Sequence, residues 1–222
     1  MAGRMLARRL IPCLNLASQA PAQADPRQAW TTLARQLEDQ GADELLISVA
    51  GLPVGSQAAE LLEAITSELS IGVIAEGGTT LQELELLVRA GASAVVVDAA
   101  HTELIVRAER AWGRAMVAAM LRYAGSGDPV PAAIDVASAG ARELIVDAAD
   151  PQPRLLKSIS EATSIPILAS GPMRSLEQVR TLFVEGRADA AILSAAWLND
   201  RHGVSEVKRY LAAAGIVVRG VN

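Results

Sequence analysis

The chain alternates between short aliphatic runs and longer stretches in which apolar residues recur at helical spacing. The helical pattern is clearest in residues 27–40, 61–65, 84–88 and 155–159. The aliphatic runs between such stretches contain few polar residues, which is typical of strands that are buried on both faces of a parallel sheet. The predicted strands are residues 10–14, 44–49, 71–75, 94–98, 115–120, 143–147, 165–169 and 190–194.

A short phrase, a glycine followed by an aliphatic run, recurs along the chain. Its copies begin at Gly41, Gly91, Gly140 and Gly186, and their spacing of roughly 50 residues fits two strand–helix units. In each copy we expect the glycine to end a helix in the left-handed conformation and the run to start the next strand. The pattern predicts a closed (β/α)8 TIM barrel with a half-barrel internal repeat, formed by residues 1–222 as one domain. An open, doubly wound sheet is the alternative.

Composition narrows the classes of function. The chain has 222 residues, 51% of them hydrophobic, and a net charge of −5, so a disordered chain is excluded and nucleic acid is not an expected partner. No apolar run is long enough to span a membrane. The single cysteine and the short apolar run after the basic stretch 4–9 indicate neither a disulfide nor a signal peptide, and predict a cytoplasmic protein.

Several motifs together resemble one known family. They are MLARRLIPCLN, GADELL, IAEGGTTLQELELLVRAGA, SIPILASGPMRSLE, ADAAILSAAW and the terminal YLAAAGIVVR. These segments are similar to the cyclase subunit of imidazole glycerol phosphate synthase, a lyase of histidine biosynthesis. The resemblance implies a (β/α)8 fold, a phosphorylated small-molecule substrate and a glutaminase subunit docked on the N-terminal face of the barrel.

The resemblance also implies two catalytic aspartates, at the ends of the first and fifth strands. This chain has Asn15 and Met120 at those positions. An amide and a thioether do not exchange protons near neutral pH, so we expect the family reaction to be absent or vestigial. We find no zinc-ligand spacing and no P-loop, and we expect no cofactor.

Two loops correspond to the family's phosphate-binding loops. The residues that match them are Gly77, Gly78, Ser170, Gly171 and Ser194, with Arg174 nearby. Glu76 and Asp98 lie beside the first loop, where negative charge repels a phosphate dianion. We therefore expect at most one phosphate site, at the second loop.

The acidic residues at the strand ends leave other functions open. Asp98, Asp147 or His101 could serve as the proton-transfer group of a changed reaction, although His101 is also read as a surface residue that begins a helix. Glu76, Asp98, Asp147 and Asp150 could instead form an acidic mouth that binds a metal or an organic cation, or could simply face water. Cys13 is expected in the core.

At the opposite end of the barrel, Arg9, Glu44 and Glu143 match three members of the family's charged ring, the gate toward the glutaminase. Ala94 replaces the lysine of that ring. The alternative is that the three residues neutralise one another. The functions considered are therefore a phosphate-ligand barrel without normal cyclase activity, an enzyme with a changed reaction, and a structural or assembly protein.

Overall fold

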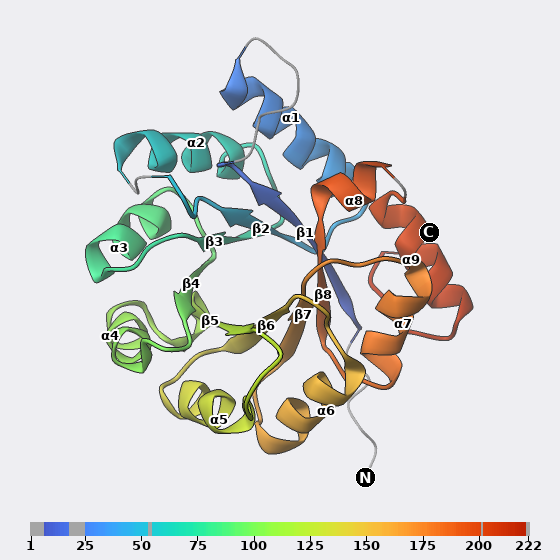
Figure 1. Ribbon diagram of the computed structural model, residues 1–222. Coiled ribbons are helices and arrows are strands. Elements are labelled where there is room, and N and C mark those ends of the chain that lie inside the picture. Colours follow the sequence, from blue (N-terminus) through green and yellow to red (C-terminus); the bar gives the residue numbers. More distant parts are fainter. Residues whose placement is uncertain (1–6, 18–24, 53–54, 201, 221–222) are drawn as a thin grey trace.

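The computed structural model describes residues 7–17, 25–52, 55–200 and 202–220. Its strands form a closed parallel barrel in which each strand pairs with its neighbours in chain order and β8 pairs with β1 (Figure 1). The strands are β1 (Arg9–Asn15), β2 (Glu44–Ser48), β3 (Gly72–Glu76), β4 (Ala94–Asp98), β5 (Val117–Tyr123), β6 (Glu143–Ala148), β7 (Ile167–Ser170) and β8 (Ala190–Ser194). The predicted (β/α)8 TIM barrel is confirmed, and the open sheet is wrong.

Helices surround the strands and alternate with them along the chain (Figure 1). They are α1 (Pro26–Asp39), α2 (Ser56–Thr66), α3 (Leu81–Arg89), α4 (Thr102–Trp112), α5 (Val130–Ser138), α6 (Pro153–Ala162), α7 (Leu176–Val184), α8 (Ala195–Asp200) and α9 (Val204–Ala213), with a 3-10 turn η1 at Arg114–Met116. Among the described residues, no helix is both long and apolar enough to cross a membrane. Arg4 of the basic N-terminal stretch and Pro53 lie outside the described residues.

The strands bury both of their faces, which explains their continuous aliphatic sequences. Outward residues such as Leu10 and Leu14 join the large cluster between barrel and helices. Inward residues fill the barrel itself, so its centre is a packed core. This inner cluster consists of Ile11, Leu46, Ile74, Ala94, Val96, Ala118, Met120, Ile145, Leu168, Ala190 and Ile192, with the partly buried Cys13 packed against it.

Local sequence signals fix several helix starts. The Thr80 hydroxyl accepts a hydrogen bond from the Glu83 N–H, and the Glu83 carboxylate accepts one from the Thr80 N–H, so α3 begins with a capping box. Asp25 caps α1, with a proline in its first turn, and the Ser175 hydroxyl accepts from the first turn of α7. These starts set where each strand-to-helix turn ends.

The repeated glycine behaves as predicted in three of its four copies. Gly41, Gly91 and Gly140 have φ of 91°, 91° and 98° at helix-to-strand junctions. In the fourth copy the left-handed residue is Arg187, with φ of 56°. The prediction for Gly186 is therefore wrong: the fourth copy has one extra residue after its glycine. A side chain at Gly186 is still excluded, because a Cβ there would lie 2.6 Å from the Leu182 carbonyl oxygen.

Several strands run further toward their carboxyl ends than the aliphatic pattern indicates. β5 is predicted to end at Met120 but continues to Tyr123, and β3 includes Glu76. From the aliphatic pattern, a strand is predicted to end at or before its first polar residue. In the barrel, ladder pairing continues past that point, since the inward side chains there meet solvent at the barrel mouth.

Candidate functional site

The carboxyl ends of the strands carry a complete ring of polar residues. Because side chains alternate along a strand, the inner cluster fixes which strand-end residues share its face. These are Asn15, Ser48, Glu76, Asp98, Arg122, Asp147, Ser170 and Ser194. Ladder pairs join Asn15 to Ser48 and Ser48 to Glu76 on one side, and Arg122 to Asp147 and Asp147 to Ser170 on the other. We call this ring the mouth.

One side of the mouth is an ion cluster on β3, β4 and β5. Arg122 Nη2 lies 2.6 Å from Glu76 Oε1, and Arg122 Nη1 lies 2.5 Å from Asp98 Oδ2. The Arg122 side chain is half exposed, whereas that of Glu76 is mostly buried. The sequence analysis missed Arg122. Its signal is the period-two alternation in VAAMLRY, which places Arg122 on the same face as Met120.

Met120 itself is not at the mouth. It is 4% exposed in the inner cluster and pairs with Asp98 in the ladder. The strand-end position on β5 is Arg122, so the predicted position is corrected by two residues. Asn15 does lie at the end of β1, where its side-chain oxygen accepts a hydrogen bond from the Ala17 N–H.

A small cavity of about 180 Å³ adjoins the ion cluster. Its lining brings together Arg122 and residues that the sequence analysis assigned to different roles: Glu76, Gly77, Gly78, Asp98 and His101. His101 is the N-cap residue of α4, which fits the prediction of a residue that begins a helix. The cavity carries two carboxylates against one guanidinium, a balance that disfavours phosphate.

Beyond the ion cluster, the mouth carries a carboxylate on β6 and hydroxyl groups on β7 and β8. The Ser170 hydroxyl donates to Asp147 Oδ1 at 2.9 Å. The Ser194 hydroxyl accepts the Trp197 N–H at 3.2 Å, so its own hydrogen remains able to donate. Asp147 forms no ion pair within the described ranges, in contrast to Asp98 and Glu76. Asp147 is therefore the mouth carboxylate whose charge is not offset by an arginine.

Gly77 and Gly171 occupy equivalent places in the two half-barrels. Each directly follows a strand, β3 or β7, and their φ values are 142° and 135°. A Cβ at Gly77 would lie 2.6 Å from Val49 Cγ2, and one at Gly171 would lie 2.1 Å from the Ala148 carbonyl oxygen. Both turns thus cross the preceding strand end at a distance that only glycine permits.

Cys13 lies at the floor of the mouth. Burial raises the pKa of its thiol to about 12, and the carboxylates of Glu76 and Asp147 act in the same direction. Relative to the ordinary value of 9.0, this shift leaves about 10³-fold less thiolate at pH 8. The thiolate is the reactive form, so Cys13 is expected to be nearly inert at that pH.

We therefore expect methyl methanethiosulfonate to modify the folded protein at pH 8 at least about 100-fold more slowly than the protein unfolded in denaturant. Mass spectrometry over time gives both rates. Similar rates in the two states would show that the thiol is neither shielded nor shifted.

The acidic mouth predicted from four carboxylates is split. Glu76 and Asp98 are both paired with Arg122, Asp147 accepts a hydrogen bond from Ser170, and Asp150 instead lines a separate cavity beside β6. Across the described part of the chain, no three carboxylate, imidazole or thiol groups are grouped as metal ligands.

The N-terminal end of the barrel is closed by a second ion cluster. Arg9 lies 2.7 Å from Glu44 and 2.8 Å from Glu143, and Arg142 lies 2.6 Å from Glu143. Burial alone would lower the pKa of Arg9, but the charges and hydrogen bonds of Glu143 and Glu44 outweigh it, so the pKa is raised. For Glu44, burial is the largest effect and raises the pKa of its carboxyl group. The fourth member is thus Arg142, while Ala94 is part of the inner core. Docking of a glutaminase-like subunit on this face stays a prediction.

Comparisons with known proteins bear on the fold. No protein-family model matches the chain. A crystal structure of 3-hexulose-6-phosphate synthase is similar to it with a TM-score of 0.68 and 19% sequence identity, over 93% of this chain and 99% of that chain. This likeness shows the barrel fold alone. The similar barrel is not a cyclase subunit and no family model matches, so the assignment to the cyclase subunit of imidazole glycerol phosphate synthase and to histidine biosynthesis is overturned.

Proposed function

We propose that the mouth binds a small phosphorylated sugar. The observation that carries this proposal is the division of the mouth into a hydroxyl-and-glycine side on β7 and β8 and a carboxylate side on β3, β4 and β6. The similar barrel, 3-hexulose-6-phosphate synthase, is by its name a sugar-phosphate enzyme, and it supports the same class of ligand.

The two sides of the mouth suit the two ends of such a ligand. The phosphate lies at Gly171 and Ser194, where the Ser194 hydroxyl and backbone N–H groups can donate and the close turn leaves no side chain in the way. The sugar hydroxyls point to Asp147 and Asp98, because ionised carboxylates only accept hydrogen bonds. Asn15 and Ser48 complete the ring of hydrogen-bonding groups.

The test is calorimetric titration with ribose 5-phosphate, with ribose and inorganic phosphate as separate controls. We expect saturable one-to-one binding of ribose 5-phosphate that is at least about tenfold tighter than either control. Ser194→Glu should abolish it through charge repulsion, and Ser194→Ala should weaken it less. If Ser194→Glu leaves the binding of ribose 5-phosphate unchanged, the phosphate does not bind on this side of the mouth.

A second candidate function is enolisation of a phosphorylated ketose, with Asp147 as the base. The observation that favours it is the unneutralised charge of Asp147, since Asp98 is held by Arg122. In this reaction Asp147 takes a proton from the carbon beside the carbonyl, exchanges it with solvent, and returns a solvent proton to the same carbon, which regenerates the carboxylate. This assignment replaces Asp98 and His101 as the first choice for proton transfer.

Exchange into heavy water tests the enolisation directly. We expect ribulose 5-phosphate to exchange its proton beside the carbonyl in the presence of the protein, as followed by proton NMR. Asp147→Asn should slow the exchange by about 10²-fold or more, because an amide cannot take the proton. Glu76→Gln serves as the matched control, because Glu76 is paired with Arg122. Exchange that survives in Asp147→Asn, or none with the native chain, would rule out this role.

The described surface gives little support to the alternative of a structural or assembly protein. Among the described residues, the exposed large apolar side chains are Leu86, Ile134, Val184 and Val217. They lie on α3, α5, α7 and the segment after α9, and so on separate elements. Scattered apolar residues are normal for a monomer surface.

A further inference from the structure

Arg122 lies between two sets of carboxylates at the mouth. On β5 it is level with Asp147 of β6, its partner in the ladder. On the other side lie Asp98 on β4 and Glu76 on β3, the two carboxylates that it contacts. One guanidinium is thus placed among three carboxylates, and its direction decides which of them stays without an ion pair.

Of the three carboxylates, that of Asp147 has the ladder position closest to Arg122. Paired residues of adjacent strands lie about 4.8 Å apart, a distance that an arginine side chain spans. Asp98 is instead level with Met120, two residues before Arg122. Glu76 lies one strand further away, on β3. The guanidinium therefore turns away from its own ladder partner, toward β4 and β3.

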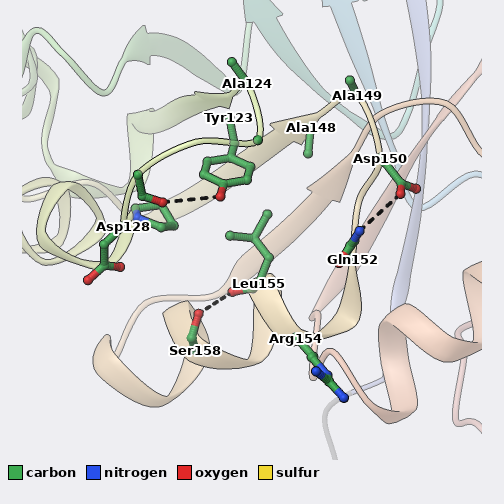
Figure 2. Close-up of a pocket in the computed structure, with 13 residues that line it drawn as sticks. Tyr123, Ala124, Asp128, Ala148, Ala149, Asp150, Gln152, Arg154, Leu155 and Ser158 are labelled. Carbon is green, nitrogen blue, oxygen red and sulfur yellow. Dashed lines mark hydrogen bonds between the residues drawn. The ribbon is translucent and has the colours of Figure 1, made fainter.

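The end of β5 is held from the outer side of the barrel wall. Tyr123 follows Arg122 and lines the cavity outside the wall, where its hydroxyl donates to the Gly127 carbonyl oxygen at 3.3 Å (Figure 2). Ala148, the ladder partner of Tyr123, follows Asp147 and lines the same cavity. Because successive side chains point to opposite faces of a strand, Arg122 and Asp147 both face the mouth. The charges within the mouth therefore set the direction of the guanidinium.

Two carboxylates attract the guanidinium together. Arg122 Nη1 contacts Asp98 and Arg122 Nη2 contacts Glu76, so each terminal nitrogen has a charged acceptor of its own. The Glu76 side chain is only 13% exposed, and a cation stabilises a mostly buried carboxylate more than one in open solvent. Asp147 offers a single carboxylate, and one of its oxygens already accepts the Ser170 hydroxyl. The pair on β3 and β4 therefore attracts Arg122 more strongly than Asp147 does.

We propose that Glu76 and Asp98 are positioning residues that hold Arg122 away from Asp147. The consequence for activity rests on the proposed enolisation, in which the Asp147 carboxylate must be free to take a proton. A guanidinium that pairs with a carboxylate covers its oxygens and favours its charged form, and both effects make the carboxylate a poorer base. Without its two acidic partners, Arg122 turns to its ladder partner and blocks the base.

Crystal structures of the native chain and of the double variant Glu76→Gln with Asp98→Asn test the direction of Arg122. The two amides keep the shapes of the side chains and lose their charge, and charge-assisted hydrogen bonds are roughly twice as strong as neutral ones. In the double variant we expect the guanidinium within about 4 Å of the Asp147 carboxylate. In the native chain we expect it beside Glu76 and Asp98. A guanidinium that stays beside the two amides would overturn the proposal.

Proton exchange of ribulose 5-phosphate in heavy water tests the consequence for the base. Three matched variants all lack the Asp98 carboxylate: Asp98→Asn, the double variant, and a triple variant that also carries Arg122→Met. We expect the double variant to exchange at least about tenfold more slowly than either of the other two. In the single variant Glu76 still holds Arg122, and in the triple variant no guanidinium is left to pair with Asp147.

Faster exchange after a further substitution is the result that distinguishes positioning from a purely structural role. If Arg122 only stabilised the ion cluster, its removal would leave the exchange equal or slower. Equal rates in all three variants, or a triple variant no faster than the double variant, would overturn the role of Glu76 and Asp98. The native chain separates the two proposals. If it catalyses no exchange, the enolisation fails, and the crystal structures alone decide whether the two carboxylates hold Arg122.

Discussion

Replacing Lys208 by methionine is expected to lower the free energy of unfolding by about 3–5 kcal/mol. The Lys208 ammonium group lies 3.0 Å from Asp43 Oδ1 and donates to the Arg219 carbonyl oxygen at 2.8 Å. Asp43 Oδ2 in turn accepts the Leu10 N–H at 2.8 Å. The side chains of Lys208 and Asp43 are 3% and 4% exposed. Methionine keeps the apolar stem but leaves the buried Asp43 carboxylate without its cation.

The other lysine of the chain, Lys157, provides the matched control. It is exposed on α6, so Lys157→Met should change the free energy of unfolding by no more than about 0.5 kcal/mol. Unfolding in guanidinium chloride, followed by circular dichroism, measures both variants. The double variant Lys208→Met with Asp43→Asn should recover part of the loss, because the unpaired charge is gone. Equal effects of the two lysine substitutions would contradict the buried ion pair.

Gly171→Val is expected to destabilise the barrel by about 3 kcal/mol or more, through strain in the turn after β7. The residue has φ of 135°, and a Cβ would lie 2.1 Å from the Ala148 carbonyl oxygen and 3.3 Å from Pro151 Cδ. A backbone oxygen in a strand cannot move aside without loss of its ladder. The turn must therefore shift away from β6, which also displaces Ser170 from Asp147.

The control variant Gly125→Val measures the cost of a side chain at positive φ without a steric clash. Gly125 has φ of 90°, and an added Cβ meets nothing within 4 Å. In this control the free energy of unfolding should fall only by the about 1–2 kcal/mol that a side chain costs in the left-handed conformation. The same denaturation experiment compares the two variants. Gly171→Val should in addition lose ribose 5-phosphate binding. If both variants are equally stable and both still bind, the close approach at Gly171 is not required.

Local pattern accounts for most of the fold. Aliphatic runs that bury both faces, helical periodicity between them and a repeat of two strand–helix units leave little but a closed parallel barrel. The fourth repeat copy shows the limit of the pattern. The repeat aligns Gly186 with the other three glycines, but α7 ends at Val184 and the left-handed residue is Arg187, because the fourth copy has one extra residue before β8.

The mouth was only partly predictable. Six of its eight residues were named from sequence: three of them, Glu76, Asp98 and Asp147, as acidic residues at strand ends, and Asn15, Ser170 and Ser194 as positions that the family resemblance implies. Ser48 and Arg122 were missed. Arg122 lies beyond the run in which β5 was expected to end, and its partners Glu76 and Asp98 are far from it in sequence.

The order of residues along the chain specifies the alternation of strands and helices, and with it the barrel and the face on which a ligand site forms. Which charges pair with each other is decided by the pairing of neighbouring strands, since that step brings strand ends that are far apart in sequence within ångströms. Strand pairing joins Arg122 to Glu76 and Asp98 and leaves Asp147 with a serine, whereas Asp150 lines a cavity outside the wall. Short-range periodicity carries no information on such contacts, because electrostatic interactions depend on distance in space rather than along the chain.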